Sequence, residues 1–271
     1  MNIKEQNKPK NIRFFVLYNN ETAIHLHGQA ELIVVLDGLL KATVDQIEYT
    51  VSPCHGIVIF PNQIHSLKSL GKSQILMCLF YPEFNHRYLE CLKKLTPVNP
   101  FFCLTELSNH SRIAIDGLLA LQAECPTDMP VPEKVLALAE GYLTLLLADV
   151  LNEMNLTDKK NAPVLELEQK LLIYIDTHFK DSLSLDILSN EFDINRFRLS
   201  RIFSERLKIS FTHYVNSRRL EYAKRLLRST KLSIIQIALE SGFSSSRTFY
   251  REFSNHYGLT PKEYQKSCPV R

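Results

Sequence analysis

The sequence predicts a multidomain α+β fold, in which a small β-barrel is followed by two helices and then by an all-α C-terminal domain. Short apolar runs alternate with turn residues between residues 13 and 81, which is typical of the strands of a sandwich or small barrel. Helical periodicity follows over residues 111–123 and 133–154, and the chain beyond about residue 166 has an almost wholly helical pattern.

Length and composition fit this prediction. The 271 residues suggest two domains, and a content of 45% hydrophobic and 23% charged residues excludes disordered and fibrous proteins. The longest strongly apolar stretch, residues 142–151, is interrupted by Thr144 and Asp149 and is shorter than the ~20 residues of a membrane span, so no membrane segment is expected. The polar N-terminus predicts no secretory signal, and six cysteines without a C-x-x-C pair indicate a reducing cytoplasm.

The β-rich part is expected to cover residues 1–110. Its strand candidates are rich in β-branched and aromatic side chains. Turn-forming stretches (NNE, DG, SPCHG, PNQ and LGKS) separate them. The predicted strands read IRFFVLY, ELIVVL, LLKATVD, IEYTV, GIVIFP and QILMCLFY.

The two predicted helices form a segment over residues 111–155, which is expected to mediate dimerisation. Apolar residues of the second helix lie on more than one side, because Leu143, Leu147 and Leu151 widen the stripe that contains Leu146. A helix of this kind is buried on several sides. Two partners explain that burial equally well: the chain's own barrel, or a second subunit of a homodimer.

A polar stretch with a proline predicts a linker over residues 156–165. It separates two parts of opposite charge. Residues 165–271 hold 18 Lys and Arg against 12 Asp and Glu, a net charge of +6, whereas residues 1–164 have a net charge of −3. The basic C-terminal domain, residues 166–271, is therefore the part expected to meet a polyanion.

The C-terminal domain contains an internal repeat. Residues 184–203 and 233–253 each predict an apolar helix, a tight turn and a second helix with apolar residues four apart. In the second copy Ala238 suits a helix crossing, Gly242 permits a positive φ and Phe243 fills the angle between the helices. This pattern predicts two helix-turn-helix units.

The second helix of each unit presents polar and basic side chains opposite its apolar positions. These side chains could form a solvated face only, but arginine also bonds guanine O6 and N7 in the major groove, and an aromatic ring can contact the thymine methyl group. An outward arginine stands at matching places in both copies, which favours DNA. We therefore expect double-stranded DNA to be contacted by Arg196, Phe197, Ser200, Arg201 and Ser204 in the first unit and by Ser246, Arg247, Tyr250 and Arg251 in the second.

Residues 213–227 predict a helix that joins the two units. This length spans ~22 Å, and with the widths of the helices at its ends it could set the two second helices ~34 Å apart, which is one turn of DNA. Its basic side chains suit contacts with phosphates, which add affinity without reading sequence. The residues expected to make such contacts are Arg218, Arg219, Lys224, Arg225 and Arg228.

These segments closely resemble the DNA-binding domain of the AraC/XylS family of transcription regulators. The resemblance rests on RRLEYAKRLL from Arg218, I-x-x-I-A from Ile234, GF at Gly242, F-x-x-x-F from Phe249 and YGLTP-x-x-Y from Tyr257. It covers about residues 171–266 and implies two helix-turn-helix units that read adjacent major grooves. Base contacts are thereby implied for Phe197, Ser200, Arg201, Ser246, Arg247, Tyr250 and Arg251.

The first unit departs from the family pattern at three positions. Ser189, Asp193 and Lys208 stand where small residues or glycine are usual. Aspartate tolerates the left-handed conformation better than most residues, so the turn is expected to form. The docking geometry of this unit is less closely defined by the resemblance than that of the second unit.

Two short motifs resemble those of cupins. HLHGQAE, followed by six residues and a glycine, resembles the first cupin motif over residues 25–38. PNQIH, residues 61–65, resembles the second, with Gln63 near the place where glycine is usual. The resemblance implies a double-stranded β-helix barrel that binds an effector, as in many AraC-type regulators.

The ionisable residues of these motifs form one candidate site, made of His25, His27, Glu31 and His65. Side chains alternate along a strand, so both motif histidines share a face, and Glu31 shares it if the strand continues. Three imidazoles and a carboxylate could bind iron, manganese, nickel or zinc. We favour the interpretation in which these residues line an effector pocket, without a metal or another cofactor.

The sequence therefore predicts a cytoplasmic transcription regulator and not an enzyme. A small molecule, a sugar or another polar metabolite, would bind in the barrel and alter DNA binding by a homodimer. One alternative is a metal-dependent cupin enzyme, an isomerase or dioxygenase, fused to a DNA-binding domain. Another is a regulator whose barrel only dimerises and senses nothing.

Overall fold

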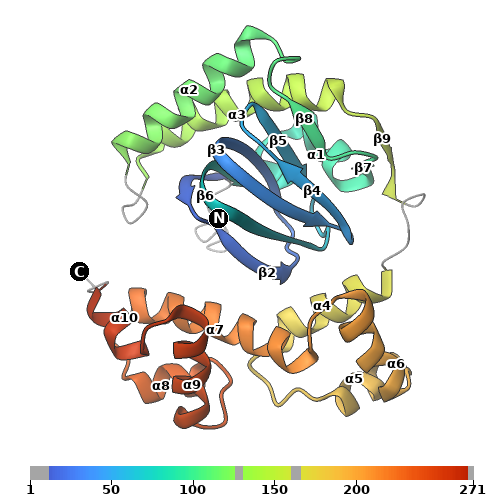
Figure 1. Cartoon of the computed structure of the whole chain (residues 1–271), viewed down its shortest axis with the longest axis vertical. Coiled ribbons are helices and arrows are strands. Elements are labelled where there is room, and N and C mark those ends of the chain that lie inside the picture. Colours follow the sequence, from blue (N-terminus) through green and yellow to red (C-terminus); the bar gives the residue numbers. More distant parts are fainter. Residues whose placement is uncertain (1–11, 126–130, 160–165, 268–271) are drawn as a thin grey trace, which may run out of the picture. The chain divides into compact units, whose positions relative to one another are not determined.

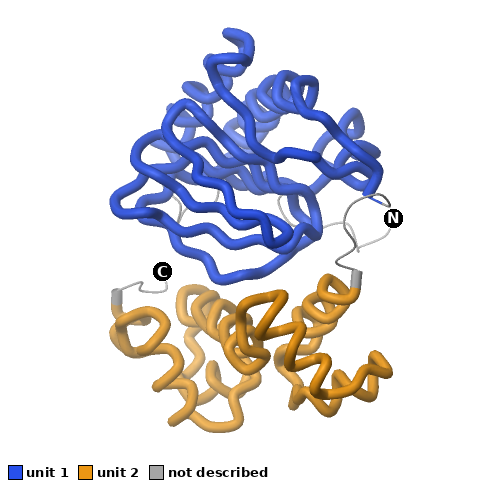
Figure 2. Tube along the Cα trace, turned by 45° about the vertical axis from the view of Figure 1, so that its right-hand side comes forward, with its two compact units in different colours: residues 1–165 blue, residues 166–271 orange. Residues whose placement is uncertain are grey.

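The computed structural model describes residues 12–125, 131–159 and 166–267. The chain divides into two compact units, residues 1–165 and 166–271, which we call the N-terminal and the C-terminal unit (Figure 2). Antiparallel strands dominate the first unit and helices make up the second, so the predicted α+β fold class is confirmed.

The N-terminal unit is built on an antiparallel sheet that has seven strands among the described residues (Figure 1). The strand order is β1-β6-β3-β5-β8, and β2 and β4 pair with one half of β6 and of β3 respectively. The strands are β1 (Ile12–Tyr18), β2 (Glu21–His25), β3 (Ala30–Val44), β4 (Ile47–Val51), β5 (His55–Ile59), β6 (His65–Phe80) and β8 (Phe101–Cys103).

β3 is long because it runs through a point where the sequence predicts a turn. Asp37 and Gly38 lie inside β3, where its pairing with β6 shifts register, and Gly38 has a φ of +74°. A Cβ atom on Gly38 would overlap the carbonyl oxygen of Lys72, so glycine is required at this point of the β3–β6 pair. The DG pair is therefore a β-bulge inside one strand, and the predicted turn is wrong.

The sheet curves around an apolar interior. Residues from both halves of β3 and β6 and from β4 and β5 meet in one buried cluster. Curvature of this kind follows from bulges, which bend a strand and increase its twist. The cluster includes Ile33, Leu40, Val51, Ile57, Leu67 and Ile75.

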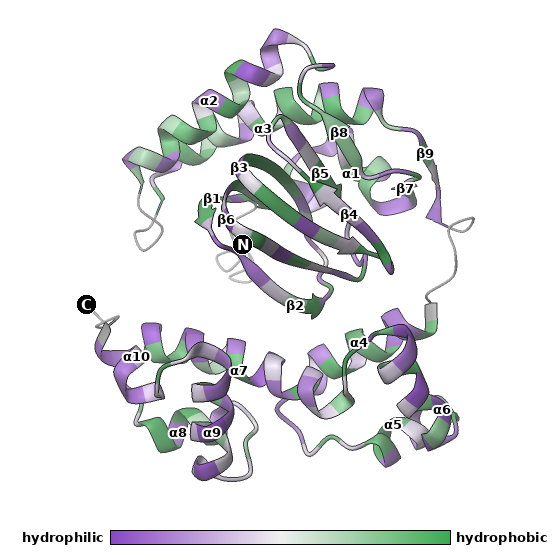
Figure 3. Cartoon of the chain, viewed as in Figure 1, coloured by the Kyte–Doolittle hydropathy of each residue, from purple (hydrophilic) through white to green (hydrophobic). Residues whose placement is uncertain are grey.

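Two helices cover the other face of the sheet, α2 (Asn109–Glu124) and α3 (Glu133–Glu153) (Figure 1). Leu118, Leu143 and Leu146 are fully buried there. With 21 residues, α3 is long and apolar enough to cross a membrane by length and composition alone, a test that core helices also pass. Its buried face belongs to the core of this unit, and that packing explains its apolar composition (Figure 3).

Several short elements follow the sheet that the sequence pattern did not predict. They are a 3-10 turn (Pro82–Phe84), α1 (His86–Lys94), β7 (Leu95–Pro97) and β9 (Leu156–Asp158). β9 pairs with β7, so the first residues of the predicted linker form a strand. The rest of that linker, residues 160–165, lies outside the described residues.

The C-terminal unit is helical throughout its described part. α5 and α6 form the first helix-turn-helix, α8 and α9 form the second, and α7 joins them (Figure 1). The helices are α4 (Glu166–His178), α5 (Leu185–Phe192), α6 (Arg196–Arg201) with a π-helical extension (Ile202–Arg206), α7 (Phe211–Ser229), α8 (Ile234–Glu240), α9 (Ser246–Tyr257) and α10 (Pro261–Ser267).

Local sequence explains why these helices begin where they do. The side chains of Ser184, Asn195 and Ser245 accept hydrogen bonds from backbone N–H groups in the first turns of α5, α6 and α9. Asp193 ends α5 in the left-handed conformation with a φ of +51°, in the position where Gly242, with a φ of +86°, follows α8. Both turns therefore form, although the first lacks glycine.

Two leucines of β3 provide a test of the packing. Leu32 is fully buried between the sheet and the helices, whereas Leu39 on the same strand is 40% exposed. We expect Leu32→Ala to lower the free energy of unfolding by about 3 kcal/mol, because a cavity remains in the core. Leu39→Ala should change it by less than about 1 kcal/mol. Urea denaturation of the two variants measures both values, and equal effects would contradict this packing.

Candidate functional site

The reading faces predicted on α6 and α9 are exposed. Phe197 is 80% exposed, and the side chains of Arg201 and Arg251 are 74% and 67% exposed. Of the other predicted residues, Arg196, Ser200, Ser204, Arg247 and Tyr250 are exposed and Ser246 is half-buried.

Buried residues on the opposite side fix the orientation of both faces. The buried residues are at most 1% exposed. They are Leu199 and Phe203 in the first helix-turn-helix unit and Phe249 and Phe253 in the second. Rotation of either helix about its axis would move these side chains into water, at a cost of about 2 kcal/mol each. The two faces are thus defined by packing and not by the polar residues themselves.

Neighbouring carboxylates form ion pairs with the exposed Arg201 and Arg251. These pairs were not predicted from the sequence. Arg201 donates two hydrogen bonds of 3.1 Å to Glu205, one helical turn away, and Arg251 donates to Glu252 at 2.9 and 3.1 Å. Ion pairs this exposed contribute little to stability, so a nucleic acid can replace them at low cost. The i,i+4 spacing of Arg201 and Glu205 is the signal that could have predicted the first pair.

The structure places Arg218 away from the expected phosphate contacts. Its side chain is only 21% exposed, and its guanidinium group lies 2.8 Å from Asp176 of α4 and 2.7 Å from Glu221. The Tyr214 hydroxyl donates a hydrogen bond of 3.0 Å to the same Asp176 oxygen. Burial raises the pKa of the Asp176 carboxyl, and the Arg218 charge opposes that shift. Arg218 thus belongs to a partly buried network that ties α4 to α7.

In the N-terminal unit, the structure brings the four motif residues together. The Nε2 atom of His27 lies 2.9 Å from Glu31 Oε1, and that of His65 lies 3.6 Å from the same oxygen. The His25 and His65 rings lie 4.2 Å apart between centroids. Glu31 and His65 are buried, whereas His25 and His27 are half-buried. One small site is therefore formed by the end of β2, the β2–β3 connection and the starts of β3 and β6.

The route by which these residues meet differs from the prediction. β2 ends at His25, and β3 begins only at Ala30, so no continuous strand places the histidines and Glu31 on one face. Pairing across the sheet sets His25 opposite His65 instead. The alternation argument is wrong for His27, which lies in the connection between two strands.

Backbone carbonyl groups orient all three imidazole rings. The Nδ1 atoms of His25, His27 and His65 lie 2.8, 3.1 and 2.9 Å from carbonyl oxygens two residues away in the chain. A carbonyl oxygen only accepts, so each Nδ1 carries a proton and the Nε2 atoms are the positions left for a ligand. A cation bound there would displace the proton that His27 Nε2 donates to Glu31. The second oxygen of Glu31 and the Nε2 of His65 have no hydrogen-bond partner in the structure.

The protonation of the site follows from burial and from these contacts. Burial alone would raise the pKa of the Glu31 carboxyl, but the hydrogen bond with His27 and the ion pair with His65 hold that pKa well below its usual range. Burial lowers the pKa of His25, and the positive charge of His65 lowers it further. The pKa of His65 is raised, because the hydrogen bond and the charge of Glu31 outweigh its burial. The site thus keeps one carboxylate negative.

The dimensions of the cluster suit a metal ion. Its four ligand atoms all lie within 4.8 Å of one another. Ligands at ~2.0–2.2 Å from one ion are at most ~4.4 Å apart, so small side-chain movements would complete the coordination. Imidazole nitrogen with one carboxylate oxygen is a ligand set for zinc, iron, nickel or manganese.

A second set of residues braces the loop that carries His65. The Asp45 carboxylate accepts hydrogen bonds from the Gln63 side chain (2.8 Å) and from the Ile64 backbone (3.0 Å), and Gln63 accepts one from the Phe60 backbone (2.7 Å). Lys159 donates a hydrogen bond of 3.4 Å to the Pro61 carbonyl oxygen of the same loop. Asp45 and Lys159 were not predicted, because neither lies in a motif. Gln63 explains how this loop is held without the glycine of the cupin motif.

Comparisons with known proteins support the assignment of the C-terminal unit. A family profile described as a helix-turn-helix domain matches residues 188–267. An uncharacterized HTH-type transcriptional regulator of Staphylococcus aureus (strain MSSA476) is 40% identical over 97 residues, which are 36% of this chain and 13% of that protein. The chain thus spans only a small part of that relative.

Two further proteins match most of the chain. The uncharacterized HTH-type transcriptional regulator YfiF of Bacillus subtilis (strain 168) is 27% identical over 268 residues, 93% of this chain and 83% of YfiF. ToxT from Vibrio cholerae O395 has a similar fold, with a TM-score of 0.56, 16% identity, and coverage of 96% of this chain and 99% of that one. Another structure of ToxT, with a TM-score of 0.50, contains an unsaturated fatty acid.

The network around Arg218 predicts a loss of stability. We expect Arg218→Met to lower the free energy of unfolding by about 3 kcal/mol, because Asp176 would keep its charge in a buried position without its cation. The exposed Arg247 serves as the control, and Arg247→Met should change stability by less than about 0.5 kcal/mol. Thermal and urea denaturation measure both. Unchanged stability of Arg218→Met together with weaker binding of DNA would support the original phosphate-contact interpretation.

Proposed function

We propose that this chain, a member of the AraC family of helix-turn-helix transcription regulators, reads double-stranded DNA with α6 and α9 in adjacent major grooves. The observation that carries the proposal is the pair of exposed arginine-bearing helices on the shared helix α7. With 19 residues, α7 is ~28 Å long, and one DNA turn is ~34 Å. The widths of the helices at its ends supply the difference.

Side-chain chemistry assigns the contacts within each groove. Arg201 and Arg251 suit bidentate bonds to guanine, and Phe197 suits the methyl group of thymine. Ser200 and Ser246 have hydroxyl groups that bond bases or phosphates. We propose further contacts with DNA for Arg196, Ser204, Arg247 and Tyr250.

We propose that the N-terminal unit senses a small molecule at the site of His25, His27, Glu31 and His65, and that its binding alters the affinity for DNA. This site is the polar end of an otherwise apolar interior. A sugar or another polar metabolite can form hydrogen bonds with these side chains. The fatty acid bound to ToxT supports regulation by a small ligand, although the apolar interior here is filled by its own side chains.

A divalent transition metal is a second candidate for the same site. Three Nε2 atoms with fixed orientation converge on one carboxylate that has an oxygen without a partner, and a cation would satisfy all of them. This observation favours a metal more than the sequence alone does. The relatives are named as transcription regulators, so such a metal would serve sensing or stability and not a cupin enzyme reaction.

We also propose that the chain forms a homodimer through α3 and acts in the cytoplasm. Leu138 and Leu145 of α3 are exposed, and Gly141 and Ala148 continue the same stripe at alternating spacings of three and four residues. This spacing is the seam pattern of paired helices. Helix α3 thus offers one face to each of the two partners considered from the sequence. One face packs on the chain's own sheet, and the other is proposed to contact a second subunit.

Substitution of the two reading arginines tests the proposal for DNA. Duplexes selected from a random pool by the full-length protein should bind Arg201→Ala and Arg251→Ala about tenfold or more weakly, since each arginine loses a base contact. Arg112→Ala, which removes an exposed charge from α2, is the control and should bind like the parent. Affinity should also fall steeply with salt because phosphate contacts release counterions. Parental affinity in both variants would overturn the assigned reading faces.

The proposed sensor site predicts a ligand-dependent melting temperature. We expect one or more of Mn, Fe, Co, Ni and Zn ions, or members of a sugar and polar-metabolite panel, to raise the melting temperature by about 5 °C near saturation. His25→Ala should abolish that increase. His55→Ala is the matched control, because His55 bonds Ser52 and lies outside the cluster. No shift with any ligand would favour a barrel that senses nothing.

A further inference from the structure

The loop between α4 and α5 (residues 179–182) leads into the first helix-turn-helix, but helix α7 holds it. Arg219 of α7 donates a hydrogen bond from Nε to the Phe179 carbonyl oxygen at 2.7 Å and from a terminal nitrogen to the Asp181 carbonyl oxygen at 2.8 Å. A charged donor makes both bonds stronger than those between neutral groups. The guanidinium group therefore attaches this loop to α7.

The turn of the second helix-turn-helix packs against the same loop. A Cβ atom on Gly242 would lie 2.7 Å from the Lys180 Cα, 2.8 Å from the Lys180 carbonyl oxygen and 2.9 Å from the Phe179 carbonyl oxygen. All three neighbours are backbone atoms, which cannot move aside as the end of a flexible side chain can. The α4–α5 loop and the α8–α9 turn therefore meet backbone to backbone, and glycine is required at the contact.

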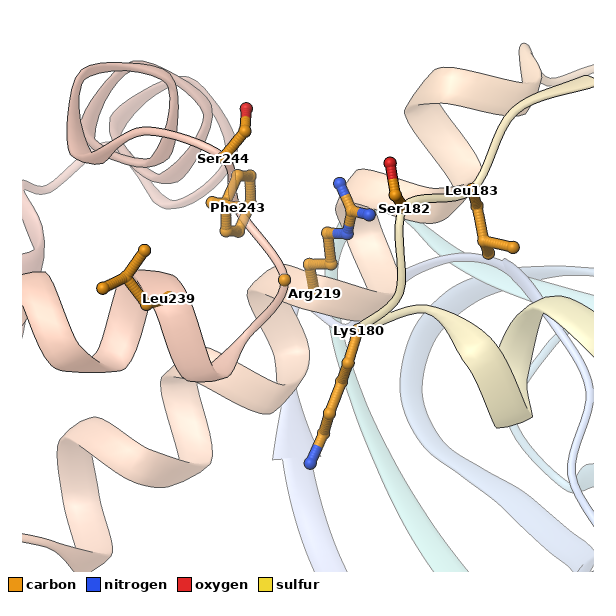
Figure 4. Close-up of a pocket in the computed structure, with 8 residues that line it drawn as sticks. Lys180, Ser182, Leu183, Arg219, Leu239, Phe243 and Ser244 are labelled. Carbon is orange, nitrogen blue, oxygen red and sulfur yellow. The ribbon is translucent and has the colours of Figure 1, made fainter.

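Cations and aromatic rings complete this contact. The Lys180 ammonium group lies 3.9 Å from the centroid of the Tyr222 ring on α7, and the Phe179 ring packs on Tyr222 with centroids 5.6 Å apart. The Arg219 guanidinium group lies 5.8 Å from the Phe243 centroid. Figure 4 shows Arg219 between the loop and the turn, beside a cleft of about 410 Å³. Loop, α7 and turn thus form one junction between the two helix-turn-helix units.

This junction supplements a connection that is otherwise a single helix. The buried core of the second helix-turn-helix unit is formed by residues of α7, α8, α9 and the α8–α9 turn. Among the described residues it includes none from α4, α5 or α6. Long helices curve, so α7 alone would define the relative orientation of the units loosely. A second attachment away from the helix axis restricts that orientation.

We propose that Arg219 and Gly242 are positioning residues that fix the distance and the angle between α6 and α9, so that the chain discriminates DNA sites by the spacing of their two halves. This inference rests on the proposed reading of adjacent grooves by both helices. One inserted base pair rotates one half-site by ~34–36° about the DNA axis and shifts it by ~3.4 Å. A rigid pair of reading helices cannot follow that rotation, whereas a loosely joined pair can.

The test compares spacing variants of a selected duplex. The full-length parent, Arg219→Met and Gly242→Ala are titrated with that duplex and with versions that contain one and two inserted base pairs between the half-sites. Gly258→Ala is the matched control, because Gly258 also has a positive φ, +69°, but has no atom within 4 Å of the added Cβ. Arg228→Met controls for the loss of one charge from α7, because Arg228 is an exposed residue in the last turn of that helix. Circular dichroism and the melting temperature of every variant monitor folding.

We expect the parent and both controls to lose about tenfold or more in affinity on insertion of one base pair, and Arg219→Met and Gly242→Ala to lose at most threefold. Both variants could instead bind all duplexes more weakly, with the same ratio of affinities for the original and the inserted duplexes as the parent. That result would show a structural role only and would overturn the inference. If Gly242→Ala fails to fold, Arg219→Met decides. Failure of the parent to select any duplex would instead reject the proposed DNA reading, and this inference with it.

Discussion

The C-terminal unit depends on one helix, α7, to which both helix-turn-helix units are attached. The ion pair between Arg218 and Asp176 sets the position of α4 on that helix, and the Tyr214 hydroxyl completes it. A buried ion pair contributes little net stability compared with well-packed apolar residues, but it defines one arrangement, because a displaced charge would lose its partner. The end of α4 leads directly into the loop held by Arg219. The position of α4 on α7 therefore also sets the position of the loop that packs against the second helix-turn-helix unit.

The N-terminal unit has a comparable constraint, since it buries a carboxylate among imidazoles. Glu31 lies at the polar edge of an apolar interior, where an unpaired charge would be costly. His27 and His65 supply the compensating hydrogen bonds and charge in the structure as it stands. The fixed Nδ1 contacts of the rings mean that a bound cation or polar ligand would meet a prearranged site, with little reorganisation of the rings.

The sequence predicted the C-terminal unit in more detail than the N-terminal one, for physical reasons. Helical periodicity, the turn at Gly242 and the caps are local signals, and they define both helix-turn-helix units and the exposed faces that we propose read DNA. The bulge at Gly38 depends on the close approach of the Lys72 backbone. This residue is far away in the sequence, so a DG pair does not reveal the contact. The four residues of the His25 cluster were predicted from their motifs, but the pairing that places His25 opposite His65 is again non-local. The ion pairs of Arg218 were not predicted, because the sequence pattern of a helix cannot distinguish an exposed arginine from one that faces a distant partner such as Asp176.

The exposed ion pairs of the reading helices bear on how this protein would select a site. Arg201 and Arg251 lie beside carboxylates that release them at little cost, so their availability does not limit binding. Two arginines, each reading guanine, specify few base pairs and would match very many sites on a chromosome. Discrimination must therefore also come from the geometry that relates the two helices, and a match at both half-sites counts only if their separation is fixed. Under the proposed DNA reading, that requirement would make the rigidity of α7 and its junctions as important for recognition as the side chains proposed to contact the bases.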